Sequence, residues 1–510
     1  MLFAHRVADV RAAEQATGDL LTSGVLMQRA AGGLAAACLR RLRSSGGVYG
    51  ALVVVLAGSG DNGGDALFAG ARLARRGAVV RVLPTGTRLH EAGLAAVQAA
   101  GGRLLNAEIG DDEVRRLFST ARLVLDGLVG IGASGPLRSP AARLATLHAE
   151  VGAVARTVAV DVPSGVDAAT GAVVGPVVAA ALTVTFGAVK PGLLLLPGSE
   201  HVGELQLVPI GLDLPAADLV ALERADVAAR LPTPGGTSSK YTRGVVGVAA
   251  GSERYPGAAV LNAGAAHHGG AGYVRFASTA HPAEQVRLRF PSVVVTEVPS
   301  DNGADGGAAR AEATLAAGRV QAWAVGSGLG TDEGADAVVR AVLAEDLPVL
   351  LDADALSIVA ADRSMLHQRR GLPTLLTPHE GEFLRLLGGD RDEAADALAA
   401  DRLGTVRQAA AELGVTVLLK GATTLVVTPE GEARVNRTGS GWLATAGSGD
   451  VLTGLCGALL ASGLSPLDAG SVAAYLHGLA GELAPVPTAA DDVLAALPAA
   501  WAAVLEGEPA

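Results

Sequence analysis

The sequence contains little lysine and little cysteine, and each shortage excludes a class of protein. Lysine occurs only at Lys190, Lys240 and Lys420, and the formal net charge is -11. Binding to nucleic-acid phosphates needs clustered basic side chains, so no nucleic-acid partner is expected. The two cysteines, Cys38 and Cys456, lie in apolar stretches that predict helices. A disulfide framework and a cysteine-rich metal site are therefore excluded.

The sequence also lacks a clear export signal or membrane span. Residues 1–15 carry scattered charges where a signal peptide needs an apolar core. Residues 170–189 form a charge-free run of about membrane-spanning length. Glycine and proline interrupt this run, and its TVTF core favours a strand, so a transmembrane helix is a minor alternative. We expect a reducing, cytoplasmic location and no membrane association.

What the chain does contain is a repeated α/β pattern. Its 510 residues include 68 glycines and are 50% hydrophobic. Short β-branched runs are followed by glycine turns and then by Ala/Leu-rich amphipathic stretches, which predicts buried parallel strands covered by helices. A polar segment with Pro, Gly and Ser, residues 213–244, predicts the boundary between two domains. The segments expected to hold strands are 51–57, 78–84, 122–128, 157–163 and 182–188 before it, and 244–252, 321–330, 348–356, 373–383 and 416–429 after it.

The pentapeptide AGSGD occurs twice, at residues 57–61 and 446–450. The second copy leads into an apolar stretch, which predicts a glycine turn at a helix N-terminus, where unpaired N–H groups suit a phosphate. Asp450 could there be the base in a phosphoryl transfer or only an N-cap. The first copy is expected to continue into a glycine loop, residues 61–65, with no helix opening at once. That loop could bind a ligand at a strand end or be an ordinary turn.

Several motifs together resemble the bifunctional NAD(P)H-hydrate repair enzymes. LAGSGDNGGDALFAGARLARRG, LVLDGLVGIGASGPLR, VAVDVPSGVDAATG and LTVTFGAVKPG are similar to their N-terminal epimerase domain. GSERYPGAAVL, VGSGLGTD, LLDADAL, LTPHEGEF, LLKGATTLV and TAGSGDVLTGLCGALLASG are similar to their C-terminal dehydratase domain. The resemblance implies an α/β protein with a Rossmann-like doubly wound domain at 1–220 and a ribokinase-like domain at 221–510.

The resemblance also implies an activity. NADH and NADPH can add water at the nicotinamide ring, and the resulting R and S hydrates no longer donate hydride. The epimerase domain would interconvert these hydrates, and the dehydratase domain would use a nucleotide to restore the S hydrate to NAD(P)H. The fused order resembles that of bacterial members, which use ADP. The implied cofactors are K⁺ in the first domain and Mg²⁺ in the second, and we expect a homo-oligomer.

The resemblance carries functional roles to individual positions. Asp161 and Asp450 are the implied catalytic residues, and Asn62, Asp126 and Ser164 are the implied potassium ligands. The implied hydrate contacts of the epimerase are Asp61, Asn62, Gly63, Gly64, Asp65, Gly130, Ile131, Gly132, Ala133, Ser134, Gly135, Pro136 and Asp161. Those of the dehydratase are Ala258, Gly328, His379 and Asp450, and its implied nucleotide contacts are Lys420, Gly421, Ala422, Thr423, Thr424 and Gly449. Without the resemblance, Asp161 would be taken for a loop cap and His379 for a turn residue.

Some positions depart from the family pattern. Asp61 stands where the family usually has asparagine, and Ala66 where it has glycine. His267 and His268, followed by Gly269, replace the usual arginine and threonine before the glycines of the second domain. Glu380 replaces a proline. Two other functions remain open. One is a kinase for a small alcohol, which would use the same fold and the same GSGD aspartate. The other is a nonenzymatic nucleotide-sensing or scaffold role for the first half of the chain.

Overall fold

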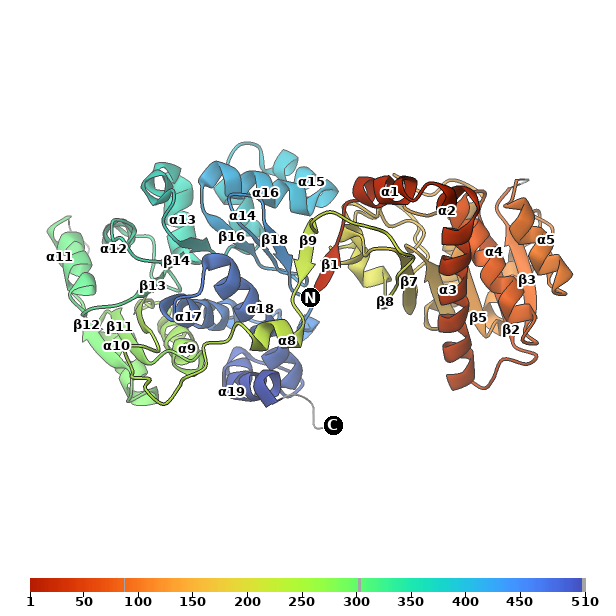
Figure 1. Ribbon diagram of the computed structural model, residues 1–510. Coiled ribbons are helices and arrows are strands. Elements are labelled where there is room, and N and C mark those ends of the chain that lie inside the picture. Colours follow the sequence, from red (N-terminus) through yellow and green to blue (C-terminus); the bar gives the residue numbers. More distant parts are fainter. Residues whose placement is uncertain (87, 301–303, 507–510) are drawn as a thin grey trace. The chain divides into compact units, whose positions relative to one another are not determined.

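The computed structural model describes residues 1–86, 88–300 and 304–506 (Figure 1). It divides into two compact units, one formed by residues 3–219 and the other by residues 1–2 together with 220–510. We call them the N-terminal and C-terminal units. The short strand β1 (Leu2–Ala4) runs across the division near the start of the chain.

The N-terminal unit is built on a parallel sheet in the order β4-β3-β2-β5-β6-β7-β8. The order reverses between β2 and β5, and open α/β sheets bind ligands at the carboxyl ends of the strands where this happens. The strands are β2 (Leu52–Ala57), β3 (Val79–Pro84), β4 (Arg103–Leu104), β5 (Leu123–Gly127), β6 (Thr157–Val160), β7 (Leu182–Phe186) and β8 (Glu204–Val208).

Helices cover both faces of this sheet. Val53 and Val55 of β2 pack into a core with α3 and α4, whereas Val54 and Leu56 pack on the other face with α6 and α7. Successive side chains of a strand point to opposite faces of the sheet. Because helices cover both faces, β2 is apolar throughout. The helices are α1 (Val7–Ala16), α2 (Asp19–Thr22), α3 (Val25–Ser44), α4 (Asp61–Ala74), α5 (Glu91–Ala99), α6 (Asp111–Thr120), α7 (Ala141–Val151), η1 (Ala153–Arg156), η2 (Pro191–Leu193) and η3 (Gly198–His201).

The C-terminal unit holds a larger sheet in the order β1-β9-β18-β17-β16-β15-β14-β13-β10-β11-β12. The strands from β16 to β12 are parallel, and β17 is antiparallel to both of its neighbours. Here the order reverses between β10 and β13. The strands are β9 (Leu219–Ala221), β10 (Val245–Ala249), β11 (Tyr273–Ser278), β12 (Val294–Glu297), β13 (Ala322–Val325), β14 (Val349–Leu351), β15 (Thr374–Leu376), β16 (Thr416–Leu419), β17 (Leu425–Val427) and β18 (Ala433–Val435).

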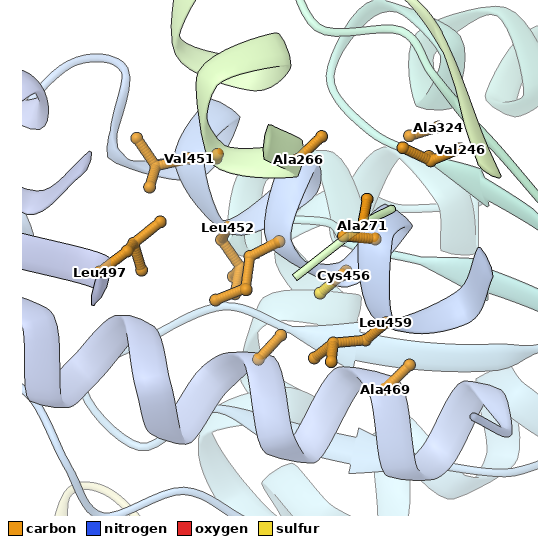
Figure 2. Close-up of a cluster of buried hydrophobic side chains, with 14 of the residues drawn as sticks. Val246, Ala266, Ala271, Ala324, Val451, Leu452, Cys456, Leu459, Ala469 and Leu497 are labelled. Carbon is orange, nitrogen blue, oxygen red and sulfur yellow. The ribbon is translucent and has the colours of Figure 1, made fainter. Parts of the chain in front are cut away.

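The central helix of this unit is α17. Its residues Leu452, Cys456 and Leu459 lie among side chains of α18, α19 and the sheet (Figure 2). Burying a leucine of this kind stabilises the fold by about 2 kcal/mol. The helices are α8 (Arg224–Ala228), α9 (Pro256–His268), α10 (Ala280–Arg289), α11 (Ala304–Leu315), α12 (Glu333–Leu343), α13 (Asp354–Ala361), η4 (Arg363–Arg369), α14 (Glu380–Leu387), α15 (Arg391–Ala400), α16 (Arg402–Leu413), η5 (Gly441–Leu443), α17 (Ser448–Ala461), α18 (Pro466–Leu483) and α19 (Ala490–Glu506).

The α/β architecture predicted from the sequence is confirmed. Every segment expected to hold a strand does so, and both cysteines lie in buried helical positions. The TVTF core of the run 170–189 is strand β7, and in the part of the chain that the structure describes no helix is long and apolar enough to cross a membrane.

Candidate functional sites

The first AGSGD copy differs from the prediction made for it. Helix α4 begins at Asp61 with Gly60 as its N-cap, so residues 61–65 form its first turn and not a glycine loop. The helix starts this close to β2 because Gly63 lacks a side chain: a Cβ there would lie 2.2 Å from the carbonyl oxygen of Gly58. Both copies of AGSGD therefore lead directly into a helix, and the interpretation of the first as a loop was wrong.

A fully buried carboxylate, Asp126, lies next to this turn at the end of β5. It accepts hydrogen bonds from the backbone N–H of Ser164 (2.8 Å) and from the Ser164 hydroxyl (2.7 Å). Burial outweighs these bonds and raises the pKa of Asp126 to about 6. The Asn62 amide donates to the carbonyl oxygens of Val129 (2.6 Å) and Val160 (2.8 Å). Asn62, Asp126 and Ser164 thus lie around the carboxyl ends of neighbouring strands, as expected.

Asp161 follows β6 and forms a buried ion pair with Lys190. Its φ of 66° is rare for a residue with a side chain, and such conformations concentrate at functional sites. Oδ1 of Asp161 accepts hydrogen bonds from the Thr185 hydroxyl (2.9 Å), the backbone N–H of Phe186 (3.0 Å) and the Lys190 ammonium. Lys190 is only 1% exposed. Lys190 lies in the motif LTVTFGAVKPG, but its role was not predicted from the sequence.

These elements surround a cavity of about 690 Å³ in the N-terminal unit. Asp61, Asn62, Asp65 and Asp161 line it, together with residues 130–133 and two residues of α1, Arg11 and Glu14. Gly63 and Gly64 are buried in α4 behind the wall, and residues 134–136 form an exposed loop. Burial and then the Asp161 carboxylate raise the pKa of Glu14. The contribution of α1 to the site was not predicted from the sequence.

The second AGSGD copy forms the predicted glycine turn. Gly447 has a φ of 89° and is the N-cap of α17, which begins at Ser448. Asp450 is therefore the third residue inside the helix, so the N-cap interpretation of Asp450 was wrong. The imidazole of His477, on α18, contacts the Ser448 hydroxyl (3.1 Å) and the Ser448 carbonyl oxygen (3.0 Å). Burial lowers the pKa of His477 to about 4.

Asp450 lies in an acidic, largely buried environment. Burial and then the nearby Asp352 carboxylate raise the pKa of Asp450 to about 7, although a hydrogen bond with Ser327 opposes the shift. Ser327 lies just beyond β13 and accepts a hydrogen bond of 3.0 Å from the amide nitrogen of Asn262 on α9. A carboxyl group with a pKa near neutrality is suited to proton transfer.

Lys420 provides the positive charge of this site. Its Nζ lies 2.8 Å from Oδ1 of Asp352 and 3.8 Å from Oε2 of Glu382. Burial alone would lower the pKa of Lys420, but Asp352 and Glu382 outweigh burial and raise it. Asp352 also accepts hydrogen bonds from Thr377 (2.9 Å) and Thr453 (2.7 Å). Asp352 lies in the motif LLDADAL, but its role was not predicted from the sequence.

A cavity of about 490 Å³ opens between Lys420 and the N-terminus of α17. Its predicted wall residues are His379, Lys420, Gly421, Ala422, Thr424 and Gly449. The chain from Thr438 to Thr445 and His477 also line it, and neither was expected. Four other described residues predicted for this site do not line the cavity: Ala258, Gly328, Thr423 and Asp450. Ala258 and Gly328 lie close together: a Cβ added at Gly328 would be 2.9 Å from the Cβ of Ala258.

His379 is the N-cap of α14. Its ring accepts a hydrogen bond of 3.3 Å from the backbone N–H of Glu382, whose side chain accepts one of 2.8 Å from the backbone N–H of His379. The residue is thus a helix cap that also lines the cavity. No group of three His, Cys, Asp or Glu side chains within residues 1–86, 88–300 and 304–506 is arranged to hold a metal ion.

Comparison with known proteins agrees with this two-site architecture. A family model described as YjeF-related protein N-terminus matches residues 23–192, and one described as NAD(P)H-hydrate dehydratase matches residues 246–498. A bifunctional NAD(P)H-hydrate repair enzyme of Mycobacterium leprae is 45% identical over 98% of this chain and 99% of its own. The chain belongs to the family of bifunctional NAD(P)H-hydrate repair enzymes.

Other members and one solved structure extend the comparison. The repair enzyme of Mycobacterium tuberculosis (strain H37Rv) is 48% identical over 90% of this chain and 89% of its own. A crystal structure of the ADP/ATP-dependent NAD(P)H-hydrate dehydratase from Bacillus subtilis, co-crystallised with ATP and Mg²⁺, is 30% identical. It covers 56% of this chain and 98% of its own, with a TM-score of 0.48.

Several of the residues that depart from the pattern of this repair-enzyme family make local contacts, whereas nothing in the structure explains Asp61. Ala66 is fully buried against Gly127, and Glu380 forms an ion pair of 3.0 Å with Arg402. The rings of His267 and His268 lie 5.2 Å apart at the carboxyl end of α9, the opposite end of that helix from Ala258.

Proposed function

We propose that the N-terminal unit interconverts the R and S hydrates of NADH and NADPH, and that the C-terminal unit dehydrates the S hydrate with ADP as phosphoryl donor. Residues 1–220 and 221–510 are the proposed domains. The observation that carries the proposal is that the chain, a member of this repair-enzyme family, has a separate cavity in each unit. The first lies at the strand-order reversal between β2 and β5, and the second lies beyond the carboxyl ends of β15 and β16. Each cavity lies beside an aspartate–lysine pair, the buried Asp161–Lys190 in one unit and the partly buried Asp352–Lys420 in the other.

In the C-terminal unit Asp450 is the proposed base. The hydroxyl of the hydrate is bonded to a carbon next to the ring nitrogen. As Asp450 removes its proton, this oxygen attacks the terminal phosphorus of ADP. The N–H groups at the start of α17, and the Lys420 ammonium, stabilise the negative charge on the transferring group. A Cβ on Gly449 would lie 3.3 Å from the Lys420 Nζ, so the glycine keeps this space open.

The resulting phosphate ester is a better leaving group than hydroxide. The lone pair on the ring nitrogen expels it, and loss of a proton from the adjacent ring carbon completes the return to NAD(P)H. Magnesium, when bound with the nucleotide, would offset the phosphate charge. It usually binds through one or two carboxylates and the phosphates themselves. Asp352 and Glu382, beside Lys420, are the proposed carboxylates.

In the N-terminal unit Asp161 is the proposed residue for proton transfer at the hydrate hydroxyl. Asn62, Asp126 and Ser164 are the proposed potassium ligands, an oxygen-only set suited to a hard cation. The surroundings of Asp126 support binding of a cation there, because, among the described residues, its carboxylate accepts hydrogen bonds only from the neutral groups of Ser164 and Leu128. A buried carboxylate with only neutral donors is stabilised by a nearby cation.

Supplying each separated hydrate to the protein, with ADP, ATP or neither, tests the proposal. We expect recovery of reduced-nicotinamide absorbance from S hydrate only with nucleotide, and from R hydrate only after its epimerisation. ADP should be the preferred donor, and tenfold better repair with ATP at equal concentration would refute that preference. Phosphorylation of a small alcohol without any return of absorbance would instead identify a kinase.

A further inference from the structure

One carboxyl group in the cavity of the N-terminal unit lacks a hydrogen-bonding partner. Asp65 is 8% exposed, lines the cavity, and has a buried Oδ1 atom without any hydrogen bond. A buried polar atom left unpaired destabilises the folded state, so its retention at the wall of a cavity indicates a group that pairs with a ligand. Asp65 lies one turn after Asp61 on α4.

The charges around Asp65 favour its neutral form. Burial, and then the carboxylates of Asp161, Asp61 and Glu14, raise its pKa well above the ordinary value. The Lys190 ammonium lowers the pKa of Asp65, but its effect is smaller than those of burial and of the three carboxylates. The same cavity therefore holds a carboxylate paired with a cation, Asp161, and an unpaired carboxyl group, Asp65. Two such groups in one pocket are the arrangement of an acid and a base.

The chemistry of the hydrate has a place for such an acid. Inverting the carbon that bears the hydroxyl requires one of its bonds to break. If the carbon–oxygen bond breaks, the ring nitrogen can form a C=N bond to that carbon, but the departing oxygen must first gain a proton. The cation formed would be stabilised by an acidic pocket. The alternative is opening of the ring at the carbon–nitrogen bond, which leaves the oxygen attached.

We propose that Asp65 is a second catalytic residue of the epimerase, the acid that protonates the departing hydroxyl, and that the reaction passes through an iminium cation. This inference rests on the proposed epimerase function and adds the bond that breaks and the group that supplies the proton. Asp65, predicted from the resemblance only as a hydrate contact, thereby takes part in the reaction together with Asp161.

The step balances as follows. The Asp65 carboxyl gives its proton to the hydroxyl oxygen, the carbon–oxygen bond breaks, and the nitrogen lone pair forms the C=N bond. The products are water, the iminium cation and the Asp65 carboxylate. A water molecule then adds to the opposite face of the carbon, and the electrons of the C=N bond return to nitrogen. Asp161 takes the proton that the added water loses, and proton exchange with solvent restores both carboxyl groups.

The first experiment uses the wild-type protein in water enriched in ¹⁸O. Pure R hydrate of NADH is supplied without nucleotide, and the S hydrate formed at early times is analysed by mass spectrometry. We expect one solvent oxygen in each S hydrate formed, above a sample without enzyme. Retention of the original oxygen would overturn the proposal. Failure of the protein to exceed the uncatalysed rate would show instead that the proposed epimerase function is wrong.

The second experiment replaces the acid. Asp65→Asn keeps the shape of the side chain but cannot supply the proton, so epimerisation should fall by about 10²–10⁴-fold. Dehydration of S hydrate with ADP should be unchanged, because it takes place in the other unit. Asp112→Asn, at an exposed position on α6, is the matched control and should epimerise normally. An Asp65→Asn rate within threefold of wild type would overturn the acid role.

The pH dependence and a conservative variant separate chemistry from folding. Asp65 acts when protonated, so wild-type epimerisation should decline as pH rises through its pKa. That pKa is set by burial and by the surrounding Asp161, Asp61, Glu14 and Lys190. Asp65→Glu should recover at least tenfold over Asp65→Asn and keep the decline, whereas Asp65→Asn should lack it. A decline that persists in Asp65→Asn would assign the acid to another group and overturn the proposal.

Discussion

Replacing Asp450 by Asn should stabilise the C-terminal unit while removing its dehydratase activity. In the folded protein, burial and then Asp352 raise the pKa of Asp450 from 3.8 to about 7. A raised pKa means that the folded state binds the proton more tightly than the unfolded state does. The stability from this proton is fully present below about pH 4 and is lost as pH rises through about 7.

The size of the effect follows from the shift. About three pKa units, at 1.36 kcal/mol each, correspond to at most about 4 kcal/mol between the two limits. Between pH 5.5 and 8, the stability of the wild type falls only up to the folded-state pKa of about 7. This interval of about 1.5 pH units corresponds to a loss of about 2 kcal/mol in the free energy of unfolding. Asn is neutral at every pH, so the stability of Asp450→Asn relative to wild type should grow by about 2 kcal/mol over this range.

Tryptophan fluorescence is a suitable assay because Trp323, Trp442 and Trp501 all belong to the C-terminal unit. Urea unfolding of the full chain at pH 5.5 and pH 8 then reports on that unit alone. Asp396→Asn, at an exposed position on α15, is the matched control and should show no such growth. A stability gain that is equal at both pH values would refute the electrostatic reasoning.

The same variant tests the proposed base. Dehydration of S hydrate with ADP should fall by about 10²–10⁴-fold, while interconversion of R and S hydrates continues. In the wild type, dehydration should increase as pH rises through about 7, because the base acts in its ionised form. Retained dehydration in Asp450→Asn, with the same pH profile, would show that another group removes the proton.

Three further predictions concern the N-terminal unit and the division between the units. Asp161→Asn should repair S hydrate normally with ADP but be limited on R hydrate to spontaneous epimerisation; loss of S-hydrate repair would contradict two separate sites. Asp126→Ala should loosen the surrounding loops and remove any potassium dependence of epimerisation, and unchanged activity at every potassium concentration would argue against the cation site. Fragments 1–220 and 221–510 correspond closely to the two compact units, each with its own core, so each should fold and keep its reaction when expressed alone. Inactive, molten fragments would mean that each unit depends on the other.

The misprediction at Asp61 has a definite physical origin. Two consecutive glycines each cost about 1 kcal/mol relative to alanine in a helix, so the sequence favours a loop there. The structure forms a helix because Ala66, Leu67 and Leu73 of α4 are fully buried in the core, which offsets the poor propensity of the first turn. Local propensity is a weak guide where tertiary packing is this extensive.

The two buried lysines show what could have been found without a structure. The chain has only three lysines, and two of them, Lys190 and Lys420, form ion pairs with aspartates at the two sites. Their scarcity and their apolar surroundings were visible in the sequence. Their partners were not, because Asp161 and Asp352 lie 29 and 68 residues away and meet the lysines only at the carboxyl ends of the sheet strands, β6 and β7 in one unit and β14 and β16 in the other.

By itself the sequence determined the α/β class, most of the central strands and the glycine turn before α17, because buried parallel strands are apolar on both faces and end at glycine-rich turns. Its ordered motifs also indicated the family. Only the tertiary structure decided which charges face one another. It paired Asp161 with Lys190, placed Glu14 of α1 in the first cavity, left Asp65 unpaired there, and put Asp450 inside α17. The pKa values of these groups depend on burial and on neighbours distant in sequence, and neither is set by local composition.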